Sequence, residues 1–144
     1  MNTAPVCFGA KDNQFGKFEV EIGGSVDSVK LVHVSGEVSC AEPILMFGLP
    51  SSKFGCQKSS PELYTFITNA NNDTLLPESR EFQSKYTLQG YHSDSTEIVF
   101  TIISTPLRLS SGQQLRIWYG EDLMDDTEHD NSGSTCVDVY AKYI

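Results

Sequence analysis

The chain has 144 residues, a length that fits one compact domain, so we expect a single domain over residues 1–144. Apolar residues make up 39% of the chain and charged residues 20%, proportions that exclude a disordered protein. The formal net charge of −9 disfavours nucleic acid and anionic lipid as partners. The sequence also lacks an apolar run of about 18 residues, which argues against membrane insertion.

Alternation of apolar and polar residues is the main pattern in the first half of the chain and predicts strands. Residues 17–22 alternate and end at a Gly-Gly pair, which predicts a half-buried strand followed by a turn. Residues 29–40 predict one long strand, or two strands joined by a bend at 35–36. The apolar run 44–49 and residues 63–68 predict two more strands.

The second half of the chain continues the strand pattern. Residues 75–92 predict mainly loop with one weak strand, because Pro77 interrupts any helix there. Residues 96–104 and 114–119 are β-rich, and we expect them to pair as a meander. The alternation over 137–144 predicts a final strand. Seven to nine short strands predict an all-β fold, an antiparallel β-sandwich or jelly roll.

The cysteines and one short motif indicate a secreted protein. No C-x-x-C spacing for metal or redox chemistry joins the four cysteines, which are Cys7, Cys40, Cys56 and Cys136. Of the three pairings, we favour Cys40 with Cys56 and Cys7 with Cys136. Residues 72–74 (Asn-Asp-Thr) form an N-glycosylation sequon, which predicts an extracellular glycoprotein with disulfides. The alternative is a chance sequon and four buried thiols in a cytosolic domain. Residues 1–5 lack signal-peptide features, so secretion implies that a leader or domain preceded them.

The most acidic stretch is residues 121–131, which carry six of the 19 acidic residues and no Lys or Arg. Like charges at this density repel one another unless water or a cation compensates them. Ca²⁺ fits best, because it accepts six to eight oxygen ligands at flexible geometry. An EF-hand is excluded, since Asn131 occupies the position of its glycine and Val137 that of its last glutamate. The alternative is a solvated acidic loop without metal.

Residues 130–134 (Asp-Asn-Ser-Gly-Ser), followed by the alternating Val137-Asp138-Val139, resemble the C-terminal calcium loop of the bacterial galactose-binding lectin family of LecA. The resemblance implies a galactose-binding-domain-like jelly roll in which Ca²⁺ contacts sugar hydroxyls directly. An upstream Asp of that family falls at Leu123 here, so Asp122 or Asp125 would replace it. The implied metal ligands are Asp122, Asp125, the carbonyl of Thr127, Asp130 and Asn131.

Residues 113–122 are also similar to secreted domains of corals and sea anemones that have no established activity. Trp118 and Tyr119 precede the acidic stretch, and alternation predicts that one ring faces the core and the other faces out. An outward ring would offer a platform for the apolar face of a sugar. The candidate ligand-binding residues are therefore Trp118, Tyr119, Glu121 and His129.

These observations predict a secreted, calcium-dependent, carbohydrate-binding (lectin-like) domain with Ca²⁺ as cofactor and a glycan as partner. The alternative is an extracellular structural, matrix or adhesion module in which calcium is purely structural. The sequence does not predict an enzyme, because its three histidines are dispersed and it contains no G-x-S-x-G elbow. A homo-oligomer is possible, and the sequence does not specify the oligomeric state.

Overall fold

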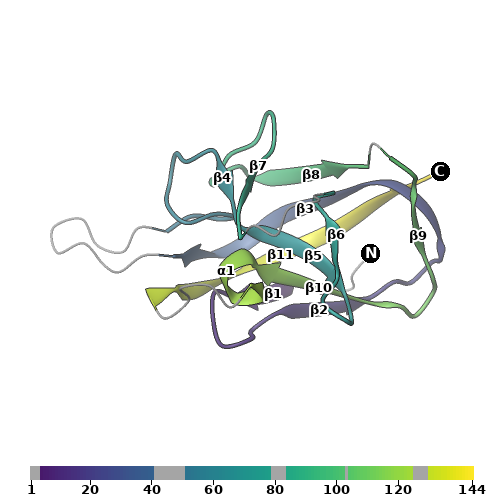
Figure 1. The fold of residues 1–144 in the computed structure, drawn as a ribbon, viewed down its shortest axis with the longest axis horizontal. Coiled ribbons are helices and arrows are strands. Elements are labelled where there is room, and N and C mark those ends of the chain that lie inside the picture. The colour runs from purple at the N-terminus through teal and green to yellow at the C-terminus, as the bar shows by residue number, and fades with distance from the viewer. Residues whose placement is uncertain (1–3, 41–50, 79–83, 103, 125–129) are drawn as a thin grey trace, which may run out of the picture.

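Two antiparallel β-sheets packed against each other make up most of the fold, which confirms the predicted all-β sandwich (Figure 1). The structure is a computed structural model that describes residues 4–40, 51–78, 84–102, 104–124 and 130–144. Within these residues no helix is long and apolar enough to cross a membrane.

The first sheet has five strands in the order β1, β11, β3 and β8, with β9 as a further partner of β3. Their bounds are Val6–Gly9 for β1, Ser132–Tyr143 for β11, Gly24–Ser39 for β3, Glu97–Thr101 for β8 and Leu107–Leu109 for β9. β11 pairs with β3 from Ser132 opposite Ser39 to Tyr143 opposite Val26. The two strands form the centre of this sheet, and β1 and β8 flank them.

The second sheet has four strands in the order β2, β10, β5 and β6. Their bounds are Gly16–Glu19 for β2, Gln114–Tyr119 for β10, Thr65–Asn69 for β5 and Thr74–Leu76 for β6. A small two-stranded sheet joins β4 (Glu62–Leu63) to β7 (Tyr86–Thr87). The one helix among the described residues, α1 (Gly120–Leu123), directly follows β10.

Period-two alternation builds the core between the sheets. On β10, Leu115, Ile117 and Tyr119 belong to the buried apolar cluster. On β11, Val137 and Val139 belong to the same cluster. Because alternate side chains of a strand point to one face, each sheet contributes one face to this interior.

Both predicted disulfides are confirmed. Cys7 bonds to Cys136, which is its partner in the register of β1 and β11, and Cys40 bonds to Cys56. The first bridge ties an edge strand near the N-terminus to the central strand β11. The second bridge lies just beyond the end of β3.

The bend predicted at residues 35–36 is present within β3. Gly36 has a φ of 81°, and the register with β11 shifts between Cys136 and Val137. A Cβ atom on Gly36 would lie 2.2 Å from the carbonyl oxygen of Ser134. Glycine is therefore required here both by the left-handed backbone and by the close approach of β11.

Two sequence-based expectations are wrong, and one lies outside the described residues. Residues 96–104 and 114–119 do not form a meander, because β8 pairs with β3 and β10 pairs with β2 and β5 in the other sheet. Ile22, which the alternation predicts to be buried, is 69% exposed, because β2 ends at Glu19 and Ile22 is not part of the strand. The predicted strand 44–49 falls outside the described residues.

The two disulfides differ in the length of chain that they close, and this predicts different contributions to stability. The double variant Cys7→Ala/Cys136→Ala should lose more free energy of unfolding than Cys40→Ala/Cys56→Ala. Sequence separations of 129 and 16 residues correspond to about 5 and about 3 kcal/mol of loop entropy. Urea denaturation of both double variants measures the difference, and a larger loss from the shorter loop would contradict it.

Candidate functional site

The acidic stretch predicted to hold a cation lies between β10 and β11. Its first part is α1, and its described last part begins at Asp130. The predicted site residues Asp125, Thr127 and His129 lie outside the described residues. The structure describes the other predicted site residues: Trp118, Tyr119, Glu121, Asp122, Asp130 and Asn131.

α1 begins where the chain passes very close to another segment. A Cβ atom on Gly120 would lie 1.7 Å from the carbonyl oxygen of Ser84, so glycine is needed at this position. The Gly120 amide donates to the carbonyl oxygen of Tyr64. Glu121 follows in the first turn of α1 and is half-buried. These contacts hold the start of the acidic stretch against the core.

Asp122 is buried and bound to the turn between β1 and β2. Its exposed fraction is 2%, its Oδ1 accepts from the Asn13 amide at 2.9 Å, and its Oδ2 accepts from the Gln14 amide at 3.0 Å. Asp12 and Asn13 in this turn have positive φ angles of 61° and 58°. Two charge-assisted hydrogen bonds thus fix a turn whose backbone is unfavourable by itself. Asp122 therefore has a clear structural role.

Asn131 is also hydrogen-bonded to the turn between β1 and β2. It is 1% exposed, and its Nδ2 donates to the carbonyl oxygen of Ala10 at 2.9 Å. The Ala10 amide in turn donates to the carbonyl oxygen of Gly133 at 3.2 Å. This bonding orients the Asn131 carboxamide and turns its Oδ1 away from Ala10.

Three consecutive residues, two just before β11 and the first of β11, each have a buried side-chain oxygen without a hydrogen bond to the described residues. These oxygens are Oδ1 of Asp130, Oδ1 of Asn131 and Oγ of Ser132. A buried acceptor left without a partner costs about 1–3 kcal/mol, so such atoms are normally satisfied by water or an ion. Asp and Asn oxygens fit a hard cation such as Ca²⁺. The described residues, however, contain no group of three or more His, Cys, Asp or Glu side chains placed to hold a metal.

Trp118 lies on the face of β10 opposite the core, as alternation requires, but it is only 3% exposed. Its ring packs on Phe15 with a centroid distance of 4.8 Å. Its Nε1 donates to Oδ1 of Asn72 at 3.1 Å. Neighbouring turns therefore cover the ring from outside the sheet.

Tyr119 lies in the core with no exposed surface. Its hydroxyl donates to the carbonyl oxygen of Gly55 at 2.8 Å, and its ring stacks on Tyr64 with a centroid distance of 5.3 Å. Burial raises the pKa of Tyr119 strongly, and the nearby charges of Glu121 and Asp130 raise it further. The phenol thus stays a neutral hydrogen-bond donor over the physiological range.

The expectation of an exposed aromatic platform beside the acidic stretch is wrong in this structure. Alternation correctly places the rings of Trp118 and Tyr119 on opposite faces of β10. A sequence pattern gives the face of a strand but not what covers that face. Here Phe15, which follows the turn that Asp122 holds, covers the outer ring.

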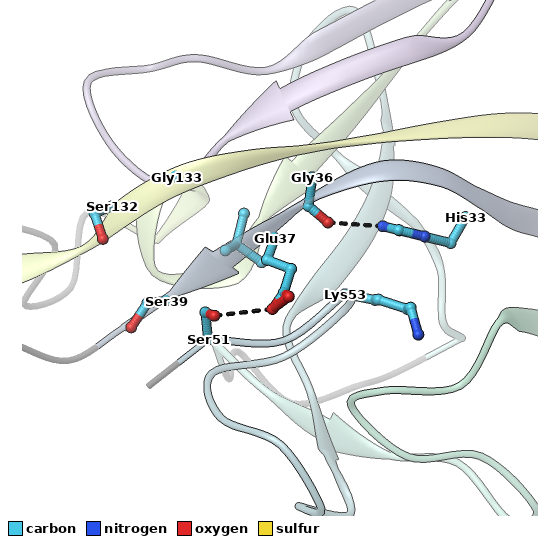
Figure 2. Close-up of a pocket in the computed structure, with 9 residues that line it drawn as sticks. His33, Gly36, Glu37, Ser39, Ser51, Lys53, Ser132 and Gly133 are labelled. Atoms are coloured by element: carbon cyan, nitrogen blue, oxygen red, sulfur yellow. Dashed lines mark hydrogen bonds between the residues drawn. The ribbon is translucent and has the colours of Figure 1, made fainter. Parts of the chain in front are cut away.

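A cavity of about 480 Å³ opens beside the start of β11, between the end of β3 and residues 51–53 (Figure 2). Its lining comprises His33, Gly36, Glu37, Val38, Ser39, Ser51, Lys53, Ser132 and Gly133. In Figure 2, His33 and Lys53 lie on one side of Glu37, and Ser39 and Ser132 lie on the other. Ser132, which lines the cavity, directly follows Asp130 and Asn131 in the sequence.

The polar groups of this cavity are held in place by neighbours. Glu37 accepts from Oγ of Ser51 at 2.9 Å and lies 4.0 Å from Nζ of Lys58. Nε2 of His33 donates to the carbonyl oxygen of Gly36 at 2.7 Å. The sequence gives no sign of this cavity, because its lining comes from three separate segments and no short motif marks them.

The bonding of Asp122 predicts that its loss destabilises the fold whether or not calcium is present. Asp122→Ala should lower the free energy of unfolding by about 1.5–3 kcal/mol, because two amides lose a charged acceptor. The measurement is denaturant unfolding in excess calcium and in excess chelator, with Glu19→Ala, an exposed acid on β2, as control. A loss that appears only with calcium would instead make Asp122 chiefly a metal ligand.

Comparison with known proteins gives one result. No protein-family model matches the chain, and no curated protein matches it. Among solved structures, the chain is similar to AJLec, a lectin from the sea anemone Anthopleura japonica. The two are 33% identical, the match covers 99% of this chain and 94% of that chain, and the TM-score is 0.87. At this identity and coverage, the chain belongs to the family of the sea anemone lectin AJLec.

Proposed function

We propose that this protein is a lectin whose carbohydrate binding depends on Ca²⁺ held at the start of β11. The observation that carries the proposal is the similarity to AJLec across nearly the whole chain at 33% identity. A shared fold alone would not support a shared function. Here a third of the aligned residues are also identical, which suggests a carbohydrate-binding, lectin-like domain.

The unsatisfied oxygens at the start of β11 support the calcium part of the proposal. Asp130 and Asn131 each bury an Oδ1 atom without a hydrogen-bond partner among the described residues. A bound Ca²⁺ would satisfy both atoms, with Asp125 and the Thr127 carbonyl as further proposed ligands. Asp122 is compatible with the same role, because a carboxylate that accepts two amide protons keeps free lone pairs.

The cavity beside the start of β11 supports the carbohydrate part. A volume of about 480 Å³ lies in the range usual for small-molecule sites. Glu37, Lys53 and Ser51 supply charged and hydroxyl groups of the kind that bind sugar hydroxyls. Glu121 and His129 remain proposed contacts on the side of the acidic stretch. Trp118 and Tyr119 are buried, so we assign them an indirect role in holding that stretch.

Two further features agree with this proposal. The similar structure is that of a lectin, which suggests a non-enzymatic function. The two disulfides are consistent with an extracellular location, where such bonds form and persist. The competing function is an extracellular structural module in which Ca²⁺ only stabilises the acidic stretch.

Calcium titration and glycan binding on matched variants separate these two functions. Asp130→Ala should weaken calcium binding about tenfold or more, because it removes a charged ligand, and glycan binding should fall with it. Calorimetric titration with calcium and a glycan array with and without chelator measure both quantities. Glu19→Ala removes an exposed charge on β2 and serves as control.

Glycan binding that survives both chelation and Asp130→Ala would contradict calcium dependence. If calcium binds but no glycan does, the structural module is the better reading. Asn131→Ala is a less selective variant, because it also removes the donor to Ala10.

The cavity predicts a variant that weakens glycan binding without weakening calcium binding. Glu37→Gln keeps the size of the side chain and its acceptor for Ser51 but removes a charge that faces the cavity. We expect glycan binding to weaken about tenfold, as the loss of one charged hydrogen bond implies, with calcium affinity unchanged. Glu97→Gln on β8 is the matched control. Unchanged glycan binding by Glu37→Gln would exclude this cavity as the sugar site.

A further inference from the structure

The sequon at residues 72–74 begins in the turn between β5 and β6 and ends at Thr74, the first residue of β6. It is the one Asn-x-Ser/Thr sequence in the 144 residues. Asn72, Asp73 and Thr74 are all exposed. The proposed lectin function uses none of these residues.

The turn that presents Asn72 is rigidly bonded. Oδ1 of Asn69 accepts from the Asn71 amide at 2.8 Å and from the Asp73 amide at 3.0 Å. The Asn72 amide donates to the carbonyl oxygen of Asn69 at 3.1 Å. Asn72 itself has a φ of 64°, a left-handed conformation that Asn tolerates better than most residues. The position of the Asn72 side chain is thus set by the turn.

The two ends of the Asn72 carboxamide have different surroundings. Its Oδ1 accepts from Nε1 of Trp118 at 3.1 Å and from NH1 of Arg116 at 3.0 Å. Its Nδ2 donates none of the hydrogen bonds found among the described residues. The oxygen is therefore held against β10, while the nitrogen is available on an exposed residue.

This arrangement is compatible with an N-linked glycan, because glycosylation changes only the nitrogen. A sugar bonded to Nδ2 leaves Oδ1 as a carbonyl acceptor, so both hydrogen bonds to β10 persist. We propose that Asn72 is N-glycosylated and that Trp118 and Arg116 fix the orientation of the modified side chain. The two disulfides support passage through the oxidising compartment where this modification takes place.

The chemistry requires a lipid-linked oligosaccharide pyrophosphate as donor. Nδ2 forms a bond to C1 of the first N-acetylglucosamine and loses one proton. The bond from C1 to the pyrophosphate oxygen breaks, and the lipid pyrophosphate leaves with the electron pair. Oxidation states are unchanged, and the product keeps one N–H on the amide.

The position of Asn72 separates this glycan from the proposed lectin site. The residues that line the cavity come from β3, β11 and positions 51–53, and none of them belongs to β5, β6 or β10. Figure 1 shows α1 at one end of β10 and the turn between β5 and β6 toward the other. We expect a glycan on Asn72 to leave calcium and carbohydrate binding unchanged.

Matched variants of the sequon test the proposal. The full chain is secreted from a eukaryotic cell with a cleavable leader, and its intact mass is measured before and after peptide-N-glycosidase. We expect a glycan mass that the enzyme removes, converting Asn72 to Asp. Thr74→Ser, which preserves the sequon, should keep this glycan, and Thr74→Ala should lose it.

Trp118 is the single tryptophan of the chain, so its fluorescence shows whether the turn is intact. Both Thr74 variants leave Asn72 in place and should keep the wild-type emission maximum, whereas Asn72→Ala should shift it to longer wavelength. A wild-type mass equal to that of Thr74→Ala would overturn the proposal. A glycan that persists in Thr74→Ala would place the modification elsewhere and overturn it as well. Glycosylation with failed sugar binding would refute the lectin function alone.

Discussion

The antiparallel pairing of β3 with β11 is the constraint on which most of this structure depends. Twelve residues of β11 pair with β3, and this pairing brings a segment near the C-terminus beside one near the N-terminus. β1 joins the outer edge of β11, and the bridge between Cys7 and Cys136 closes that contact covalently. The cavity lies where the pair ends, and the opposed residues Ser39 and Ser132 both line it.

The turn between β1 and β2 connects the candidate site to this framework. Asp122 accepts from Asn13 and Gln14, and Asn131 donates to Ala10, so residues on both sides of the acidic stretch bond to one turn. Hydrogen bonds to a carboxylate are strong, and buried ones are costly to lose. The geometry of a cation site at Asp130 and Asn131 would therefore depend on the N-terminal turn as much as on the acidic stretch itself.

Much of the fold was predictable because strand alternation is a local property. The strand 114–119 was predicted with its observed bounds, and its inward residues Leu115, Ile117 and Tyr119 lie in the core. The two disulfides were also predicted correctly. Strand pairing was not, since β8 and β10 belong to different sheets and nothing in either segment specifies its partner. The prediction of an exposed aromatic ring on β10 was wrong for a similar reason, because Phe15, from a distant part of the sequence, covers Trp118.

The sequence by itself determined the all-β class, the faces of the strands, the even number of cysteines, the sequon and the concentration of acidic residues. Each of these follows from residue type and short-range spacing, which act locally. Only the tertiary structure decided that Asp122 binds backbone amides, that Asn72 binds Trp118, and that a cavity forms beside Ser132. Those contacts join residues separated by tens of positions, so they exist only once the two sheets have assembled.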